Sequence, residues 1–283
     1  MSERESYPHG VPCWVDLLVN EPERATAFYK ELFGWEFLGP GPMPDGGGYH
    51  VAQVNGCDVA GVGSAPPRPD GAPAVPAAWN TYVAVDSADA TAERARAAGG
   101  MVIAGPFDAP PAGRAAILQA TDGSVIGIWE ARDRTGAQRV NEPSAWAMSV
   151  LQTTDPGAAT TFYSEVFGWE AWSPPGAGDG FGRFTLFRLP GYVGGEPQQP
   201  VPRDVIAAMV GTDEPPAPGI HAVWGVDFWI DSAQRAVATA PSAGGSVIAE
   251  PHVVPPFRRV VLADPCGALF SVSELQLDLL GAR

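Results

Sequence analysis

A twelve-residue phrase occurs twice in the chain and constrains its fold more than any other feature. TAFYKELFGWEF spans residues 26–37, and TTFYSEVFGWEA spans residues 160–171, with eight of the twelve aligned positions identical. In both copies apolar residues recur every three or four positions, which is typical of an amphipathic helix that packs on a sheet. The glycine that follows, Gly34 or Gly168, predicts a left-handed helix end. One chain therefore carries the same strand-and-helix unit twice.

A second repeat extends this pattern over nearly the whole chain. Residues 82–103 match residues 227–248, and both read as a strand, an Asp-Ser helix cap, a helix, a Gly-Gly stop and a strand. A turn and a last strand follow at 121–130 and again at 264–274. Each half therefore reads as strand, helix and three strands, twice over. This predicts an α+β chain of four βαβββ units.

The division between the halves is read from composition. We expect a first domain over 10–132 and a second domain over 144–276. The polar stretch 133–143 between them, which is rich in turn-forming residues, is the expected linker. A repeat of this size that occurs only twice indicates duplicated domains rather than a solenoid.

The order of these signatures resembles the vicinal oxygen chelate superfamily, which includes glyoxalase I, bleomycin-resistance proteins and extradiol dioxygenases. The resemblance rests on AFYKELFGW after a strand, then VDSADA and AAGG, then TDG before a last strand. It implies that the βαβββ units form two curved, cup-shaped mixed sheets with helices packed outside. Similar tandem proteins, often called hydroxylases, occur near antibiotic pathway genes, including those of anthracyclines such as doxorubicin.

Enzymes of this superfamily bind a divalent metal through His, Glu or Gln side chains on particular strands. The resemblance places the corresponding positions of this chain at Trp14, Met148, Asn80, Gly225, Gly127, Ser271, one of Ala60 and Gly61, and one of Ala207 and Ala208. None of these is His or Glu, and the single neutral oxygen of Asn80 does not hold a metal. We therefore expect no metal and no cofactor. Glyoxalase or dioxygenase chemistry is then the least favoured function.

Aromatic and polar side chains stand at and beside these positions. Because strand residues alternate between faces, residues two positions away also line the cups. The tandem form resembles a fused version of the usual dimer, which implies that each cup takes strands from both halves. One cup is expected to contain Trp14, Asp16, Asp227, Trp229, Ser271 and Ser273. The other is expected to contain Asn80, Tyr82, Gly127, Trp129, Met148 and Gln152.

Aromatic rings beside a few polar groups suit a flat, conjugated ligand. Asp16 and Asp227 could face an amine on such a ligand. As an alternative, each tryptophan of the cups simply fills core space, and Trp35 and Trp169 are assigned to packing outright. Asp86 and Asp231 are interpreted as helix caps. Arg114 and Arg259, which open equivalent strands, could contact an anionic or carbonyl group, but strand-edge arginines are usually solvated, and this is the expectation for both.

Charge and cysteine usage limit the partners. The formal net charge is −15, which disfavours nucleic acid and anionic membrane partners and favours a cationic small molecule. Three scattered cysteines argue against a disulfide framework or a zinc site. With neither a signal peptide nor a long apolar run, we expect a cytoplasmic protein. Because the fusion supplies both halves, a monomer is expected.

The leading hypothesis is metal-free binding of a small aromatic natural product, for drug sequestration or to assist a biosynthetic pathway and its enzymes. The competing hypothesis is a cofactor-independent or partner-assisted tailoring enzyme, a hydroxylase or cyclase acting on a polyketide. Asp16 or Asp227 would then be the general base, with a pKa raised by the apolar cup. A third hypothesis, a metal-dependent lyase, requires different strand registers.

Overall fold

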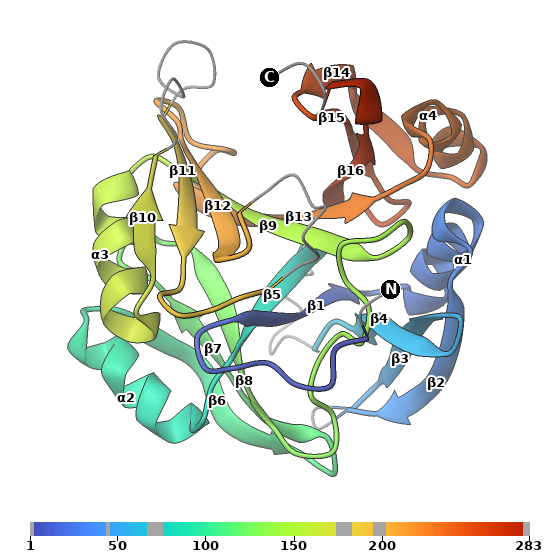
Figure 1. The fold of residues 1–283 in the computed structure, drawn as a ribbon. Coiled ribbons are helices and arrows are strands. Elements are labelled where there is room, and N and C mark those ends of the chain that lie inside the picture. The colour runs from blue at the N-terminus through green and yellow to red at the C-terminus, as the bar shows by residue number, and fades with distance from the viewer. Residues whose placement is uncertain (1–2, 44–45, 67–75, 174–182, 195–201, 280–283) are drawn as a thin grey trace.

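The computed structural model describes residues 3–43, 46–66, 76–173, 183–194 and 202–279. These residues form four successive βαβββ units, which confirms the fold class expected from the repeat (Figure 1). The first half contains β1 (Pro12–Val19), α1 (Pro22–Phe33), β2 (Glu36–Pro42), β3 (Gly48–Val54), β4 (Cys57–Ser64), β5 (Ala78–Ala84), α2 (Ala88–Ala97), β6 (Met101–Ala109), β7 (Gly113–Gln119) and β8 (Val125–Ala131). The second half contains β9 (Trp146–Thr153), α3 (Pro156–Phe167), β10 (Glu170–Trp172), β11 (Arg183–Arg188), β12 (Val205–Gly211), β13 (Ala222–Trp229), α4 (Ala233–Ser242), β14 (Ser246–Val254), β15 (Phe257–Ala263), β16 (Leu269–Leu275) and a short 3₁₀ helix at Leu277–Leu279.

Each half builds one eight-stranded mixed sheet. The strand order is β2-β3-β4-β1-β5-β8-β7-β6 in the first sheet and β10-β11-β12-β9-β13-β16-β15-β14 in the second. The central strands β1 and β5 run antiparallel, and each pairs on its other side with a parallel strand, β4 or β8. Both sheets curl into half-barrels with the helices on their convex sides (Figure 1).

The expected composition of the two cups is wrong. Every strand of the first sheet lies between residues 12 and 131, and every strand of the second lies between 146 and 275. Trp14 therefore pairs with Tyr82 of its own half, and Asp227 pairs with Met148 of its own half. Alternation along a strand predicts which face a side chain takes, but it carries no information about which strand comes next to it. That choice depends on contacts between segments far apart in the chain.

Local signals explain where the helices begin and end. The carboxylate of Asp155 accepts the backbone N–H of Ala158 at 3.0 Å and caps α3, and Pro156 occupies the first turn. At the other end, Gly34 and Gly168 have φ angles of 72° and 75°, a left-handed conformation that glycine adopts without strain. Among the described residues, no helix is long and apolar enough to span a membrane.

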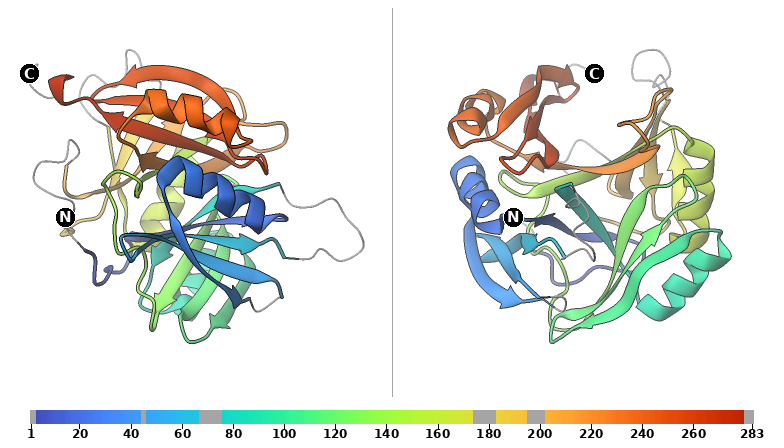
Figure 2. Two further views of the ribbon diagram at one scale, coloured as in Figure 1. Left: turned by 90° about the vertical axis from the view of Figure 1, so that its right-hand side faces the viewer. Right: turned by 180° about the vertical axis from the view of Figure 1, so that it is seen from behind.

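The two half-barrels stand back to back. Their convex faces meet near β5 and β13, where the hydroxyl groups of Thr81 and Ser149 lie 2.6 Å apart in a buried hydrogen bond. α1 lies beside α4 on one flank, and α2 lies beside α3 on the other (Figures 1 and 2). Each flank therefore holds one helix from each half of the chain.

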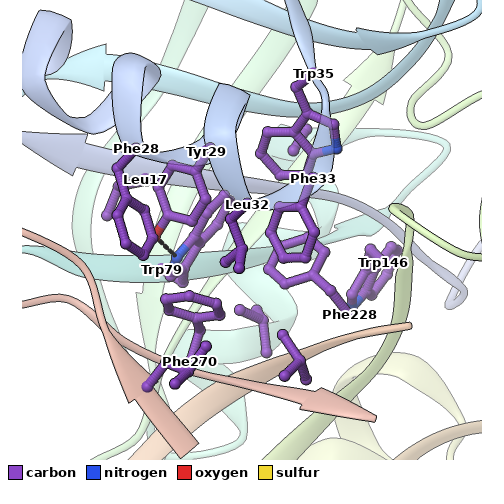
Figure 3. Close-up of a cluster of buried hydrophobic side chains, with 14 of the residues drawn as sticks. Leu17, Phe28, Tyr29, Leu32, Phe33, Trp35, Trp79, Trp146, Phe228 and Phe270 are labelled. Carbon is purple, nitrogen blue, oxygen red and sulfur yellow. Dashed lines mark hydrogen bonds between the residues drawn. The ribbon is translucent and has the colours of Figure 1, made fainter. Parts of the chain in front are cut away.

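The largest buried cluster joins the two halves (Figure 3). Phe228 of β13 lies 5.0 Å from Trp79, 5.2 Å from Phe33 and 5.5 Å from Trp35, measured between ring centroids. The Nε1–H group of Trp79 donates a hydrogen bond to the Tyr29 hydroxyl at 2.9 Å. Such ring contacts add to the free energy of burying apolar surface. Trp35, as predicted, is fully buried and serves packing.

In both copies of the repeated phrase, the tryptophan donates a hydrogen bond to a backbone carbonyl far away in the sequence. The Nε1–H of Trp35 donates to the carbonyl of Ser144 at 2.7 Å, and that of Trp169 donates to the carbonyl of Gly10 at 2.6 Å. Each tryptophan thus attaches the end of its helix to a backbone segment distant in sequence. The duplicated motif therefore has a structural explanation, since it fixes how the halves dock.

Candidate binding sites on the open faces of the two sheets

Each sheet has an open face, defined here as the face turned away from the helices. The open face of the first sheet includes Gly61, whereas Ala60 belongs to the helix-side core. In the second sheet Ala208 lies on the open face, whereas Ala207 belongs to the helix-side core. Of the alternatives left by the sequence, Gly61 and Ala208 are thus the residues that face the cups.

Asp16 lies at the centre of the first open face and is buried. Its carboxylate accepts hydrogen bonds from the side-chain amide of Asn80 at 2.9 Å and from the Tyr49 hydroxyl at 3.2 Å. The Tyr49 oxygen in turn accepts the Nε1–H of Trp14 at 2.8 Å. Burial raises the pKa of Asp16 to about 6, although hydrogen bonds from Asn80, Tyr82 and Tyr49 oppose the shift. Asp16 is therefore a buried carboxyl group whose hydrogen-bond partners are side chains of the same sheet.

Two glycines make this arrangement possible. A side chain at Gly61 would overlap the hydroxyl of Tyr49, and one at Gly127 would overlap the ring of Tyr82. The rings of Trp14 and Tyr82 are themselves only 8% and 9% exposed. Aromatic side chains thus occupy the space above the glycines, and the centre of the first cup is filled by the protein.

The second open face has a different polar group at its centre. One oxygen of the buried Asp227 carboxylate, Oδ1, accepts the hydroxyl groups of Ser271 at 2.6 Å and Ser273 at 2.9 Å. The Nε atom of Arg259 lies 3.4 Å from the same oxygen, and its Nη2 atom donates to Ser271 at 2.7 Å. Among the described residues, Oδ2 of Asp227 has no hydrogen-bond partner.

Half-buried apolar side chains flank this group. On one side, the rings of Trp229 and Phe257 lie 5.7 Å apart. On the other, Met148, Trp172 and Phe184 pack against a small buried cluster on β9, β11 and β12. The rings of Trp172, Phe184, Trp229 and Phe257 are all half-buried. The second cup therefore combines aromatic walls with a polar floor.

The predicted site residues lie together in two sets, one in each half of the chain, and not in the two mixed sets that were expected. The first open face carries Trp14, Asp16, Asn80, Tyr82, Gly127 and Trp129. The second carries Met148, Gln152, Asp227, Trp229, Ser271 and Ser273. Trp129 is anchored by its Nε1–H, which donates to the carbonyl of Arg134 at 2.8 Å. Gln152 lies exposed at the rim, away from Asp227.

Two residues that contribute to these sites, Tyr49 and Arg259, were not predicted as site residues from the sequence. Tyr49 lies on β3, a strand that carried no motif. Arg259 was expected to be solvated like Arg114, but the two are not equivalent. Arg114 pairs with Glu130 of β8, whereas Arg258 pairs with the matching Glu274 of β16. Arg259 is one residue further along, and a shift of one residue changes the face. Alignment of Arg259 opposite Ser273 would have predicted that its side chain lies on the open face.

Asp86 and Asp231 do not cap their helices, contrary to expectation. The neighbouring Ser87 and Ser232 accept the backbone N–H groups of Ala90 and Arg235, each at 3.2 Å.

Glu130 and Glu274 cap the same two helices from the last strand of each sheet. They accept the first-turn N–H groups of Ala88 at 2.8 Å and Ala233 at 2.9 Å. These carboxylates are therefore committed to structure and are turned away from the cups.

The donor set at the cups does not fit a metal ion. Within the described part of the chain, no group of three or more His, Cys, Asp or Glu side chains is placed to hold one. Asp227 has two hydroxyl groups and the Arg259 guanidinium as neighbours, and one carboxylate with these neighbours does not supply the ligand set of a metal ion. Around Asp16 the neighbours are an amide, two phenols and an indole.

Comparison with known proteins defines the class. A family model described as the glyoxalase/bleomycin resistance protein/dioxygenase superfamily matches residues 13–128, and one described as a glyoxalase-like domain matches residues 148–273. The chain belongs to this superfamily as a tandem, two-domain member. It is 38% identical to CFP32 of Mycobacterium tuberculosis over 275 residues, covering 96% of this chain and 97% of that protein. It is also 32% identical to the anthracycline biosynthesis protein DnrV of Streptomyces peucetius over 277 residues, covering 94% of each.

Solved structures agree on the fold. The Mn(II)-bound glyoxalase from Novosphingobium aromaticivorans has a TM-score of 0.61 at 17% identity, covering 98% of this chain and 84% of that one. The 2,3-dioxygenase LapB from Pseudomonas sp. KL28 has a TM-score of 0.61 at 14% identity, covering 97% and 93%. At these identities the likeness concerns the fold alone.

Proposed function

We propose that the chain binds a small aromatic natural product in the cup of its second sheet, using its own side chains and no metal. The observation that carries the proposal is the Asp227 group, in which Ser271 and Ser273 hold one carboxylate oxygen and leave the other to a ligand. Aromatic walls beside a few convergent polar groups are typical of sites for flat ligands. The first cup, filled by Trp14, Tyr49 and Tyr82, is assigned a structural role.

Two of the relatives and the charge support a ligand of the anthracycline kind. DnrV and the similar DauV of Streptomyces sp. are described as anthracycline biosynthesis proteins. An amine on a polycyclic ligand would pair with the free oxygen of Asp227 while the rings lie against Trp229. The net charge of −15 favours the approach of a cation. Such binding would serve drug sequestration or assist a biosynthetic enzyme in the cytoplasm, with no nucleic acid or membrane partner and with the chain as a monomer.

The test is a fluorescence titration with doxorubicin. We expect stoichiometric quenching of tryptophan emission, with the ligand recovered unchanged by mass spectrometry. Asp227→Asn keeps the shape of the site and removes the charge, so we expect affinity to fall about 10-fold or more. Asp16→Asn is the matched control, because it makes the same chemical change in the filled cup and should leave affinity unchanged. If Asp16→Asn weakens binding and Asp227→Asn does not, the cups are assigned the wrong way round.

A second candidate function is a cofactor-independent tailoring enzyme, such as a polyketide cyclase. The observation in its favour is the pKa of about 6 at Asp16, since a general base works best when its pKa is near the operating pH. In this function Asp16 would abstract a proton from the substrate once Tyr49 moved aside. Conversion of a polyketide substrate without added metal or flavin, lost in Asp16→Asn, would favour the enzyme. Unchanged substrate would favour the binding protein.

A further inference from the structure

A cavity lies at the rim of the first cup, where the linker crosses from β8 toward the second half. Its volume is about 220 Å³, larger than an engineered cavity of about 150 Å³ that binds benzene in another protein. Its walls are Asp58 near the start of β4, Pro111 and Ala112 in the turn between β6 and β7, and residues 133–136 and 138 of the linker. We call it the linker cavity. It is separate from the Asp227 group, which belongs to the second sheet.

The walls of the linker cavity are held together by the chain itself. The backbone N–H groups of Asp133 and Arg134 donate to the carbonyls of Pro111 at 3.3 Å and Ala112 at 3.1 Å. The guanidinium of Arg134 forms an ion pair with the carboxylate of Asp58 and so joins the linker to β4. The linker cavity is therefore formed before any ligand arrives, which lowers the entropic cost of binding.

Three polar side chains of the walls have hydrogen-bonding capacity that the fold does not use. In the described part of the chain, no group bonds to the carboxylate of Asp133 or to the hydroxyl of Thr135. The side-chain oxygen of Gln138 accepts the backbone N–H of Asp58 at 2.8 Å, which leaves its NH₂ group without an acceptor there. Asp133 and Gln138 are exposed and Thr135 is half-buried, so a ligand can reach all three side chains.

These three groups differ in hydrogen-bonding character. The carboxylate of Asp133 only accepts, the NH₂ group of Gln138 only donates, and the hydroxyl of Thr135 does both. A ligand hydroxyl also donates and accepts, so a molecule with several hydroxyl groups can satisfy all three side chains at once. Pro111 and Ala112 add an apolar part of the wall beside these polar groups.

We propose that the linker cavity binds a monosaccharide. The sugar hydroxyls would donate to Asp133, accept from Gln138 and bond to Thr135, and the C–H groups of the ring would lie against Pro111. The volume of the cavity suits a single sugar ring. This site does not depend on the proposed function, because it lies in the other half of the chain and uses none of the residues of the second cup.

The experiment is saturation-transfer NMR on the full chain, titrated with glucose, galactose or ribose, and with cyclohexanol as a ring that has a single hydroxyl. Polyols stabilise folded proteins in general because they are excluded from the protein surface, so a rise in melting temperature is not used as evidence of binding. We expect a saturable signal with at least one of the sugars and none with cyclohexanol. Asp133→Ala and Thr135→Val each remove about one hydrogen bond to the sugar and should lower its affinity about 5-fold or more. Neither side chain has a partner among the described residues, so the melting temperature without sugar should stay the same.

Two variants serve as controls and should bind the sugar as the parent does. Asp278→Ala removes an exposed carboxylate from the 3₁₀ helix at Leu277–Leu279, and Asp227→Asn changes the polar group of the second cup. The proposal is overturned if none of the three sugars gives a saturable signal or if cyclohexanol binds as well as they do. It is also overturned if Asp133→Ala and Thr135→Val both keep the parent affinity, or if Asp227→Asn alone removes binding, since the sugar would then lie in the second cup. No aromatic ligand is added, so failure here leaves the proposed function untouched.

Discussion

Single residues decide which side chains lie at the centre of each cup. In the first sheet, glycine at positions 61 and 127 admits the phenol of Tyr49 and the ring of Tyr82, and these close over Asp16. In the second sheet, the position that pairs with Asp227 on β16 is Ser271, whose hydroxyl donates a hydrogen bond to the carboxylate. Two sheets with the same topology thus present different chemistry because a few side chains differ in size.

The buried carboxyl of Asp16 gives a prediction about pH. Its pKa rises from 3.8 to about 6 in the folded chain, so the folded state binds the proton more tightly than the unfolded state does. Its contribution to stability is therefore fully present below about pH 4 and is lost as pH rises through 6. The loss is about 3 kcal/mol, from 1.36 kcal/mol per pKa unit. Urea unfolding between pH 4 and 7 should show this fall relative to Asp16→Asn, which cannot titrate. Parallel curves for the two proteins would contradict the prediction.

At the scale of strands, the two sheets differ in how closely other atoms approach a glycine on the open face. β4 of the first sheet approaches the Tyr49 ring of β3 so closely that it needs Gly61. β13 of the second sheet contains Gly225 on the open face, where a methyl group would make only ordinary contact, 3.8 Å from the carbonyl of Val150. Both glycines lie on the open face of a sheet, but an aromatic ring lies directly over Gly61 and none lies over Gly225.

This difference predicts opposite tolerance to alanine. Gly61→Ala should displace Tyr49 and break its hydrogen bonds to Asp16 and Trp14, with a loss of about 1–3 kcal/mol in the free energy of unfolding. Gly225→Ala, the control, should change stability by less than about 0.5 kcal/mol. Both are measured by urea unfolding. Equal losses would mean that the filling of the first cup is not what requires glycine.

On the scale of the whole molecule, the halves are bound by a shared core rather than by shared sheets. The cluster in Figure 3 takes Tyr29, Phe33, Trp35 and Trp79 from the first half and Phe228 and Phe270 from the second. Residues of each half fill space beneath the other's helices. We therefore expect the two halves to unfold together.

Phe228→Ala tests this coupling. Removing the ring leaves a cavity among Phe33, Trp35 and Trp79, and the expected cost is about 3–5 kcal/mol. Hydrogen exchange followed by mass spectrometry should show loss of protection in β1 and β5 of the first half as well as in β13. Val253→Ala, on an exposed side chain of β14, is the control and should alter neither half. Loss of protection confined to the second half would show that the halves unfold independently.

The units, the helix ends and the packing role of Trp35 and Trp169 could be predicted because their signals are local. Each unit is marked by a cap, an apolar stripe and a glycine stop within about 20 residues. The prediction of the two cups is wrong because the pairing of β1 with β5 depends on contacts between residues at least 60 positions apart in the chain. Arg259 was misjudged because a one-residue offset between the repeats reversed its face.

The amino-acid sequence by itself determined that this chain folds as four βαβββ units, since periodicity, caps and glycine stops act between neighbouring residues. Only the tertiary structure decided that each sheet stays within its own half, that Tyr49 closes the first cup, and that Asp227 meets Arg259 in the second. These outcomes depend on which strands and side chains come together across long stretches of chain. The physical reason is that packing and hydrogen bonding between distant segments select among pairings that local patterns leave equal.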